Sequence, residues 1–455
     1  MIALDALGPG GAYRTRNRLP VTDVAGTPLA ELSLVPLLYI LRTMPALRRA
    51  RPLPVDARRS ALADAGELFA RGEVDGMTVA DYRHTVSRMS GTPMPVVRAA
   101  VDQIAQFAAG AHDRGLQSAR PVGAGQDWRD QRTRQGAAVW IRRGEVFAVH
   151  AAGNHPAVHS GWLEALAAGY RVAVRPSRRE PLTPYRLVSA LRACGFGDDQ
   201  VVLLPTGHDT ADDILRRADL GMVYGGQDVI DKYADVPSVL PNGPGRSKIL
   251  ITADSDWRDH VDLLVDSVSA QGGTACVNTT AVFVEGDPAP VAAAIAERLA
   301  TIPGLPPEDE KAVLPVYPVA TAKGIESYLL ARTSGATAHL GGDGVVEELG
   351  SGGAVLRPAV FELADPHAAQ ARIELGFPCV WVAPWTRAAG IAPLRDTLVL
   401  TAVTTDESLL DDLLAEPSIR NLYIGDHPTY WMAPGVPHDG YLGEFLMRSK
   451  GVIRD

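Results

Sequence analysis

The sequence has 455 residues, of which 46% are hydrophobic and 21% are charged, and its net charge is -9. This length exceeds what one hydrophobic core usually supports, so we expect two linked globular domains. The ordinary hydrophobic and charged fractions argue against a wholly disordered chain and against a membrane protein. The negative net charge has the wrong sign for neutralising a phosphate backbone, so we expect no nucleic-acid partner.

The three cysteines, Cys194, Cys276 and Cys379, are too few and too scattered for a disulfide framework, and no pair has metal-ligand spacing. We therefore expect a reducing compartment and no metal site. The most hydrophobic early stretch, residues 32–41, is short and contains Pro36, and no basic segment leads into it. These features favour a cytoplasmic protein without a membrane partner.

The first regular elements predicted along the chain are helices. Residues 55–109 are rich in helix formers and carry apolar side chains three or four positions apart, which is typical of helices that pack on a core. Residues 115–136 are polar and rich in Arg, Gln and Gly, and an alternating segment around Trp140 follows them. This second pattern predicts an extended arm or an edge strand.

From residue 146 onward, strand and helix signals alternate at a spacing that predicts parallel βαβ units covered by helices. The expected strands are 146–150, 171–174, 201–204, 220–223, 247–251, 280–284 and 399–403, and the expected helices are 162–168, 184–193 and 261–269. Six glycines cluster between residues 341 and 353 without a surrounding strand-turn-helix pattern. We therefore expect a flexible loop there and not a phosphate cradle.

Among the three cysteines, Cys276 is the best candidate for a nucleophile. It follows the small residues 272–275 and precedes a β-rich stretch, which would let a substrate approach its sulfur closely. Cys194 ends a predicted helix and Cys379 follows Pro378, so packing is the expected role of both. A reactive thiol also needs surroundings that lower its pKa and donors that stabilise an oxyanion.

Five motifs resemble those of the aldehyde dehydrogenase superfamily, in the same order. Residues 152–156 (AGNHP) resemble the family's Pro-Trp-Asn-x-Pro, and residues 167–177 (AAGYRVAVRPS) resemble its Ala-Ala-Gly-x-x-Val-x-x-Lys-Pro-Ser. Residues 223–226 (VYGG) are similar to its Phe-Thr-Gly-Ser turn. Residues 271–276 (QGGTAC) are similar to its Gly-Gln-x-Cys nucleophile motif, and residues 374–379 (ELGFPC) to its Glu-x-Phe-Gly-Pro-Val. The resemblance extends from about residue 90 to the C-terminus.

This resemblance implies a three-layer α/β fold with a Rossmann-like cofactor domain and a second α/β catalytic domain. By the same resemblance, residues 1–245 form the NAD(P)-binding domain, including an oligomerisation arm near 115–140. Residues 246–425 form the catalytic domain with the nucleophilic Cys276. Residues 426–455 form a C-terminal segment that returns to the cofactor and oligomerisation region. A homodimer or homotetramer is expected.

The catalytic residues implied are Cys276 and Asn154. Cys276 would attack an electrophilic carbonyl carbon as a thiolate. The side-chain amide of Asn154, together with the backbone N–H of Cys276, would stabilise the resulting oxyanion. The alternative for Asn154 is a turn residue placed before Pro156.

The resemblance also implies residues that bind a dinucleotide. Gly225 and Gly226, at a strand-to-helix turn, would let a pyrophosphate approach backbone N–H groups. A bare pair of glycines is weak evidence by itself. Glu374 would accept hydrogen bonds from the nicotinamide ribose, and the alternative is an exposed carboxylate at a helix end.

The segment Arg175, Pro176 and Ser177 matches the family's Lys-Pro-Ser, whose Lys contacts the adenosine ribose. Arg178 stands where members that prefer NAD often place Glu. Two guanidinium groups would pair with a 2′-phosphate, so we expect NADP as the cofactor, with NAD as a possibility. Alternatively, Arg178 and Arg179 form a solvated surface pair.

One departure from the family bears on the reaction. Residues 242–246 (NGPGR) align with the Glu-Leu-Gly-Gly-Lys stretch whose Glu activates the deacylating water, and Asn242 cannot act as a general base. The sequence thus resembles the acyl-thioester reductase branch, which includes the fatty-acyl reductase of bacterial bioluminescence. The expected substrates are a small-molecule aldehyde or an acyl thioester.

Two alternatives remain open at this stage. One is an NAD(P)-dependent aldehyde dehydrogenase that forms a free carboxylic acid with another carboxylate as the base. The other is a catalytically silent member kept as a binding protein, because Gly153, Asn242 and Thr274 depart from the commonest pattern.

Overall fold

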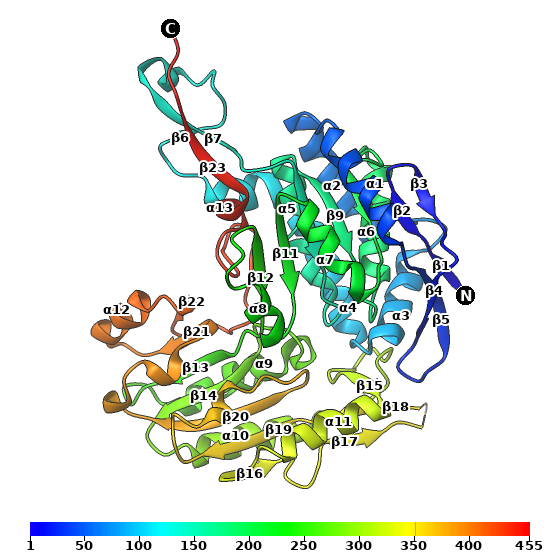
Figure 1. Cartoon of the computed structure of the whole chain (residues 1–455). Helices are drawn as coiled ribbons and strands as arrows, with labels where there is room; N and C mark the ends of the chain where they lie inside the picture. The colour runs from blue at the N-terminus through cyan, green and yellow to red at the C-terminus, as the bar shows by residue number, and fades with distance from the viewer. Residues whose placement is uncertain (351) are drawn as a thin grey trace.

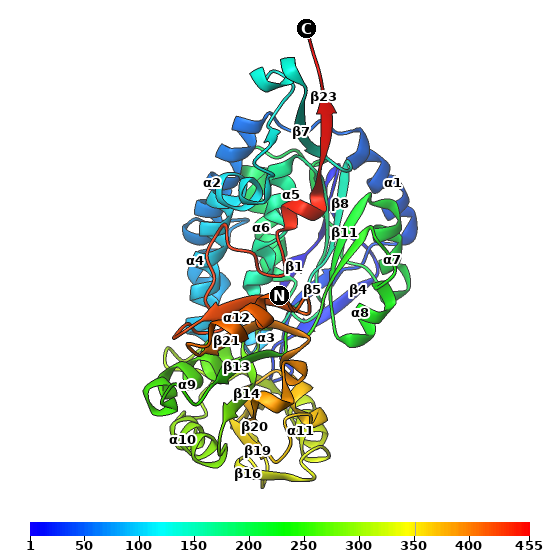
Figure 2. The same ribbon diagram turned by 90° about the vertical axis from the view of Figure 1, so that its left-hand side faces the viewer.

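The computed structural model describes residues 1–350 and 352–455, and it contains two α/β lobes and a projecting arm (Figures 1 and 2). The helices of the first lobe are α1 (Leu37–Arg49), α2 (Val55–Arg71), α3 (Val79–Ser90), α4 (Met94–Gly110), α5 (Leu163–Ala168), α6 (Leu182–Ala193), α7 (His208–Arg217) and α8 (Gln227–Tyr233). The helices of the second lobe are α9 (Val261–Ser269), α10 (Ala289–Ala300), α11 (Val319–Leu330) and α12 (Glu407–Ala415). The last helix, α13 (Leu442–Leu446), lies at the base of the arm.

The first lobe is built on a seven-stranded sheet with the order β12-β11-β8-β9-β10-β2-β3. Its strands are β2 (Ala6–Gly8), β3 (Gly11–Tyr13), β8 (Val146–His150), β9 (Arg171–Arg175), β10 (Val201–Leu203), β11 (Leu220–Tyr224) and β12 (Val239–Asn242). The five strands from β12 to β10 are parallel, and the hairpin β2–β3 extends the sheet in antiparallel fashion. The strands predicted within 146–223 are therefore confirmed, and they form the parallel core.

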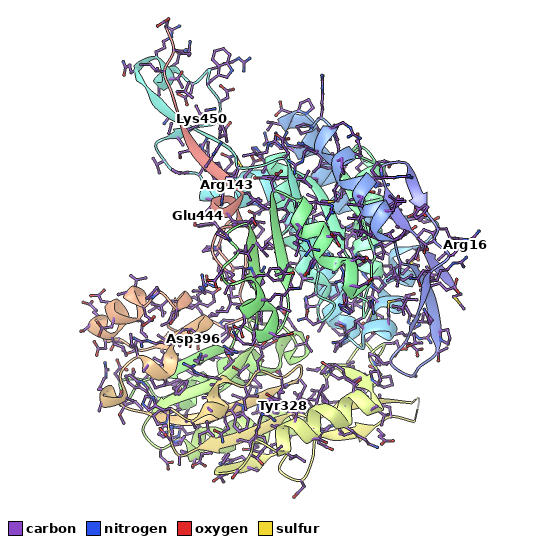
Figure 3. The ribbon with its side chains drawn as sticks, in the orientation of Figure 1. Arg16, Arg143, Tyr328, Asp396, Glu444 and Lys450 are labelled. Atoms are coloured by element: carbon purple, nitrogen blue, oxygen red, sulfur yellow. The ribbon has the colours of Figure 1, made fainter. Side chains whose placement is uncertain are left out.

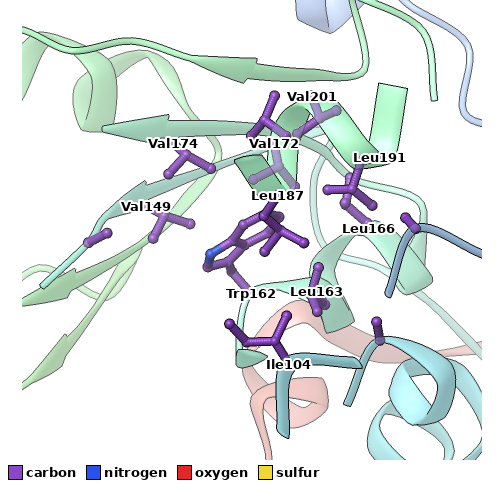
Figure 4. Close-up of a cluster of buried hydrophobic side chains, with 14 of the residues drawn as sticks. Ile104, Val149, Trp162, Leu163, Leu166, Val172, Val174, Leu187, Leu191 and Val201 are labelled. Atoms are coloured by element: carbon purple, nitrogen blue, oxygen red, sulfur yellow. The ribbon is translucent and has the colours of Figure 1, made fainter. Parts of the chain in front are cut away.

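Helices cover both faces of this sheet, which gives three layers. The helices α1 and α7 pack on one face, and α2, α4, α5 and α6 pack on the other. On the second face the fully buried Trp162 lies among Val149, Val174 and Leu187 (Figure 4). Each such aliphatic side chain contributes roughly 1.5–3 kcal/mol through burial, so this cluster holds the segment that follows Asn154 against the sheet.

The N-terminal fifty residues are more regular than the sequence analysis indicated. A small sheet with the order β1-β5-β4 contains β1 (Ile2–Leu4), β4 (Arg18–Thr22) and β5 (Pro28–Ser33). The hydrophobic stretch near residue 40 forms the amphipathic helix α1, in which Ile40, Met44 and Leu47 are buried. The predicted helical region 55–109 is confirmed, and it divides into α2, α3 and α4.

The second lobe also has three layers around a seven-stranded sheet, with the order β16-β19-β20-β14-β13-β21-β22. Its strands are β13 (Ser247–Ile251), β14 (Thr279–Glu285), β16 (Ala336–Leu340), β19 (Ala359–Leu363), β20 (Cys379–Trp385), β21 (Thr397–Val403) and β22 (Ile419–Ile424). All pairings are parallel except β16 with β19. The helices α9 and α10 cover one face, and α11 and α12 cover the other.

The glycine cluster between residues 341 and 353 is not the single loop that was expected. It contains β17 (Val346–Glu348) and leads into β18 (Gly353–Leu356), and both belong to the small antiparallel sheet β15-β18-β17, with β15 at Val316–Pro318. Two short strands thus interrupt the expected loop, whose flexibility stays a prediction, and residue 351 lies outside the described residues. Gly341 and Gly344 have φ values of 80° and 125°.

The arm is a three-stranded sheet of β6 (Ala124–Gly125), β7 (Ala137–Arg142) and β23 (Met447–Val452). The chain leaves the second lobe after β22, passes along the first lobe and ends as β23, which pairs antiparallel with β7. In Figure 3, Arg143 lies at the base of this arm and Lys450 lies further along it. Its role in oligomerisation and the domain limits at 245 and 425 stay predictions. No helix within the described ranges is long and apolar enough to cross a membrane.

Candidate active site

A cavity lies where the two lobes and the C-terminal segment meet, and we call it the large cavity because more residues line it than line the cavity described next. The N-terminal lobe contributes Phe107, Met222 and Leu240 to its wall, and the C-terminal segment contributes Met432 and Val436. These side chains are apolar, whereas Asn154, Asn242, Cys276 and His438 bring polar groups to the same wall. An apolar pocket with a few convergent polar groups is typical of a site for a small organic molecule.

A second cavity, which fewer residues line and which we call the small cavity, lies on the other side of the loop that carries Cys276. It is lined by Thr274, Glu374 and Tyr317, among others. Asn154 and Ala275 border both cavities. The cysteine loop therefore separates two compartments.

The shape of the cysteine loop explains the small residues before Cys276. The backbone φ angles of Gln271, Gly272 and Gly273 are 54°, 74° and 65°, values that residues other than glycine rarely adopt. A Cβ atom on Gly273 would lie 2.4 Å from the backbone nitrogen of Pro378. The expectation that these residues give a substrate access to the sulfur is wrong for Gly273, because the neighbouring chain fills that space.

Cys276 itself lies between this turn and β14, with its thiol facing the large cavity. Burial raises the pKa of the thiol to about 12, and the charges of Glu374 and Asp439 act in the same direction. The backbone N–H groups of Cys276 and Val277 act in the opposite direction. In this resting arrangement the thiol is protonated at neutral pH, so a reaction through its thiolate requires a base.

His438 is a basic group in contact with the thiol, and no motif in the sequence indicated it. Its Nε2 lies 3.6 Å from Cys276 Sγ. The side chain of Asn421 on β22 donates hydrogen bonds to the carbonyls of His438 and Leu398, which ties the C-terminal segment to the second lobe. The only signal in the sequence is a histidine within the Pro- and Gly-rich stretch 434–440, and such a stretch by itself indicates a loop.

Asn154 is placed beside Cys276, as the motif implied. Its Nδ2 donates a hydrogen bond of 3.0 Å to the carbonyl of Thr274, two residues before the nucleophile. The residue before it, Gly153, touches Ser177, because a Cβ on that glycine would lie 2.4 Å from Ser177 Oγ. The turn therefore positions the Asn154 amide and packs on the Arg-Pro-Ser segment as well.

Glu374 is held by the backbone of the second lobe. Its carboxylate accepts a hydrogen bond of 2.7 Å from Arg246 N. Burial raises its pKa to about 7, which the N–H groups of Arg246 and Gly245 partly offset. The alternative of an exposed carboxylate at a helix end is wrong, since Glu374 lines the small cavity in a loop after a short 3-10 turn.

The remaining predicted dinucleotide contacts lie at the carboxyl ends of β9 and β11, which flank β8. Arg175 ends β9 and is buried, and Pro176 and Ser177 follow it. The Nε atoms of Arg175 and Arg178 are buried without hydrogen-bond partners among the described residues. In open α/β sheets this edge is where ligands bind.

The alternative of a solvated pair at positions 178 and 179 does not hold for Arg179. Arg179 donates to the carbonyl of Ser90 and lies 4.9 Å from the centre of the Tyr317 ring. Arg178 Nε is buried. Arg179 is therefore engaged with the rest of the protein, and Arg178 is only partly exposed.

Gly225 and Gly226 form the turn between β11 and α8, as expected. A Cβ on Gly225 would lie 2.4 Å from the side chain of Val229. The backbone N of Gly225 donates to the carbonyl of Asn242, 3.0 Å away. The first glycine is therefore required by packing within the turn, whatever binds there.

Asn242 lines the large cavity together with Cys276. Its Nδ2 is buried and has no hydrogen-bond partner within the described part of the chain. Two carboxyl groups border this cavity, those of Glu164 on α5 and Asp439. Burial raises the pKa of Glu164 to about 7. Within residues 1–350 and 352–455, no group of three His, Cys, Asp or Glu side chains could hold a metal ion.

Known proteins agree with this architecture. The model of the aldehyde dehydrogenase family matches residues 46–391. The 2-hydroxymuconic semialdehyde dehydrogenase of Pseudomonas sp. (strain CF600) is 27% identical over 276 residues, which are 56% of this chain and 55% of that protein. The aligned part thus spans about half the length of this relative.

Solved structures resemble the whole chain. An NAD-dependent aldehyde dehydrogenase from Sinorhizobium meliloti superposes with a TM-score of 0.83 at 20% identity, covering 99% of this chain and 94% of that one. An NADP-dependent enzyme from E. coli gives a TM-score of 0.82 at 16% identity, covering 99% and 98%. An indole-3-acetaldehyde dehydrogenase in complex with NAD+ gives 0.82 at 17% identity, covering 100% and 97%. These likenesses confirm the expected three-layer fold.

Proposed function

The chain belongs to the aldehyde dehydrogenase family, and we propose that it is an NAD(P)-dependent oxidoreductase that interconverts an aldehyde and an acyl thioester. The reaction proceeds through an acyl-enzyme on Cys276. The coarser part of this proposal, oxidation of an aldehyde with a nicotinamide cofactor, is supported by the family match and by the names of the relatives. The finer part, the use of a thiol as acyl acceptor, rests on Asn242.

In the oxidative direction, Cys276 attacks the carbonyl carbon of the aldehyde in the large cavity. The Asn154 amide and the Cys276 backbone N–H stabilise the oxyanion of the resulting thiohemiacetal, and losing one such donor typically costs ~10²–10³ in rate. The amide of Asn154 is already aimed at the loop that carries Cys276, 3.0 Å from the carbonyl of Thr274. Little reorganisation is needed for it to serve the reaction.

The residues at the strand ends fit a nicotinamide dinucleotide. Arg175 and Arg178 leave buried Nε donors without partners, and a 2′-phosphate would satisfy two adjacent guanidinium groups. The preferred cofactor is therefore NADP, and NAD remains an option because both occur among the similar structures. Gly225 and Gly226 would face the pyrophosphate, Pro176 and Ser177 the adenosine ribose, and Glu374 the nicotinamide ribose. When bound, the oxidised cofactor would supply the hydride acceptor and the reduced cofactor the hydride donor.

The observation that carries the thioester assignment is Asn242 in the wall of the large cavity. An amide cannot remove a proton from water, so an acyl group on Cys276 persists until a better nucleophile arrives. A thiol meets this need, because its thiolate is a strong nucleophile near neutral pH. In the reductive direction the same steps run backward from an acyl thioester, and the aldehyde is released.

The second candidate function is that of an aldehyde dehydrogenase that forms a free acid. It is favoured by a specific observation, since His438, Asp439 and Glu164 border the same cavity and are able to accept a proton. Any of them would substitute for the missing carboxylate at position 242 if it could direct a water at the acyl carbon.

One experiment separates the two functions. The purified protein is mixed with a medium-chain aldehyde and NADP+, and the reduced cofactor and the carboxylic acid are both measured. We expect a single burst of about one equivalent of NADPH per Cys276 and almost no acid, because Asn242 cannot activate a deacylating water. Pantetheine, the thiol end shared by coenzyme A and carrier proteins, then restores steady turnover. Steady acid formation without a thiol would contradict the thioester assignment.

A further inference from the structure

The imidazole of His438 is the group best placed to take the proton of the nucleophile. Its Nε2 lies 3.6 Å from Cys276 Sγ, within the range of a sulfur hydrogen bond. We propose that His438 is a catalytic base that removes the thiol proton of Cys276 as the sulfur attacks. This inference rests on the proposed function only in taking Cys276 as the nucleophile, and it does not depend on whether a thiol or water accepts the acyl group.

The position of His438 is set by tertiary contacts. Asn421, which is buried on β22, donates to the carbonyls of His438 and Leu398. Leu398 N in turn donates to the carbonyl of Gly245, 2.8 Å away. The C-terminal segment is thus linked to the strand β21 and to the loop that packs on Cys276.

The same loop packing limits how far the thiol can move from His438. A Cβ on Gly245 would lie 1.8 Å from the carbonyl oxygen of Cys276, so the two backbones are in direct contact. Ser247 Oγ also donates to that carbonyl, at 3.0 Å. The cysteine backbone is therefore fixed on one side, and its sulfur faces His438 on the other.

Charged and titratable groups face this pair from four elements. Asp439, next to the imidazole, pairs with Arg420 at 3.6 Å. Glu164 on α5 and Tyr224 on β11 border the same cavity, and Glu374 acts on Cys276 from the side of the small cavity.

These groups leave the imidazole neutral and the thiol protonated before the reaction. Burial lowers the pKa of His438 below its ordinary value, which the charge of Asp439 partly opposes. The pKa of the Cys276 thiol is raised to about 12. A neutral imidazole beside a protonated thiol is the arrangement that general base catalysis requires.

The proposed step balances in protons and electrons. As the Cys276 sulfur forms a bond to the carbonyl carbon, its proton moves to Nε2 of His438, and the carbonyl π electrons move to oxygen. The products are an oxyanion held by Asn154 and an imidazolium. The imidazolium returns its proton when the thiohemiacetal or the leaving thiol needs one, so His438 is regenerated. Since Nε2 is the acceptor, the hydrogen of the neutral ring resides on Nδ1.

Other candidates for this role are less suitable. Glu374 accepts a hydrogen bond from Arg246 N on the far side of the cysteine loop. Asn242 has no basic atom at neutral pH. Lys248, whose pKa burial lowers to about 7, donates to the carbonyls of Arg246 and Arg395 inside the second lobe.

The test is the alkylation of the full-length protein by iodoacetamide without aldehyde or cofactor. Sulfur displaces iodide in this reaction, and the thiol proton goes to the base and then to solvent. The alkylated peptide that contains Cys276 is quantified by mass spectrometry from about pH 5 to about pH 10, a range that spans the ordinary pKa values of His and Cys. In the unmodified protein we expect the rate to rise with a midpoint below 6.5, the ordinary value for His, and then to level off.

In His438→Gln we expect alkylation of Cys276 at pH 7 to slow by ~10² or more, the usual contribution of a general base. The rate should then rise only near or above the ordinary thiol pKa of about 8.5. The matched control is His427→Gln, which changes an exposed histidine of the same C-terminal segment and should leave the profile unchanged.

An unchanged midpoint and an unchanged rate in a folded His438→Gln protein would overturn the proposal. If that variant does not fold, the unmodified protein decides alone, because a midpoint above about 8.5 means that no base assists the thiol. The proposed function is tested independently of the role of His438. Steady acid formation without a thiol contradicts the thioester assignment even where alkylation depends on His438, and thiol-dependent turnover with His438-independent alkylation contradicts only the role of His438.

Discussion

The side chains that line the two cavities on either side of the cysteine loop are positioned by different kinds of contact. On the side of the small cavity, Glu374 accepts a hydrogen bond from the backbone N–H of Arg246. Both residues belong to the second lobe, and each lies in a recognisable motif. On the side of the large cavity, His438 and Glu164 come from the C-terminal segment and from α5, and Asn242 from the end of β12. The residues expected to contact the cofactor thus lie in recognisable motifs, whereas His438 and Glu164 lie in segments that the motifs do not include.

The largest expected effect comes from removing the nucleophile, whose loop separates the two cavities. Cys276→Ala should lower kcat by at least ~10⁴, because no covalent intermediate forms, whereas the dissociation constant of the dinucleotide should hardly change. Steady-state kinetics and a fluorescence titration with NADPH measure the two quantities. Cys194→Ala is the control and should retain full activity, and turnover of Cys276→Ala within about tenfold of the unmodified protein would remove this residue from the mechanism.

The next effect concerns Asn154, which borders both cavities. Asn154→Ala should reduce kcat by ~10²–10³ and change KM much less, because the oxyanion exists only along the reaction path. Initial rates over a range of aldehyde concentrations give both constants. A rise in KM with an unchanged kcat would assign Asn154 to substrate positioning.

A third prediction uses a buried carboxyl group of the large cavity. The pKa of Glu164 is raised from 4.5 to about 7, so its contribution to folding stability is complete below pH 4.5 and is lost as the pH rises to about 7. The full loss is on the order of 3 kcal/mol. Glu164→Gln should therefore raise the free energy of unfolding above pH 7 relative to the unmodified protein and have little effect near pH 4.

Urea unfolding at several pH values measures this difference, and Glu67→Gln on the exposed face of α2 is the control. A difference between the unmodified and the Glu164→Gln protein that does not change with pH would mean that Glu164 stays charged in the folded state.

The smallest expected effect comes from changing Arg178, which follows the strand end where we propose that the adenosine ribose binds. Arg178→Glu should shift the ratio of kcat/KM for NADPH over NADH toward NADH by on the order of tenfold, because a carboxylate repels a 2′-phosphate. Arg216→Glu, which alters an exposed guanidinium of α7, should not shift the ratio. An unchanged ratio in Arg178→Glu would show that the guanidinium does not face the cofactor.

Much of the fold follows from local patterns. The strands β8, β9 and β11 have apolar residues at their centres and are almost entirely buried, as expected for parallel strands covered on both faces. The short N-terminal strands were not predicted, because segments of three to six residues such as Gly11–Tyr13 carry too little pattern. The stretch after Gly341 was assigned to a single loop, because the two strands in it are only three and four residues long and lie among glycines.

The site was predictable where the residue itself lies in a recognisable motif. Cys276, Asn154 and Glu374 lie in motifs, and the structure brings them to one loop. His438 could not be predicted in the same way, because its contact with Cys276 spans 162 positions and its support comes from Asn421 on another strand. A local sequence pattern does not reveal a contact between residues so far apart in the chain.

The central claim is that the acyl group on Cys276 waits for a thiol. The most direct measurement is the mass of the peptide that contains Cys276 after the protein has been incubated with aldehyde and NADP+ and then digested under acidic conditions. We predict that this peptide carries the added mass of the acyl group, that the adduct persists in thiol-free buffer, and that pantetheine removes it as the acyl thioester. A peptide that stays unmodified while carboxylic acid accumulates would contradict the account.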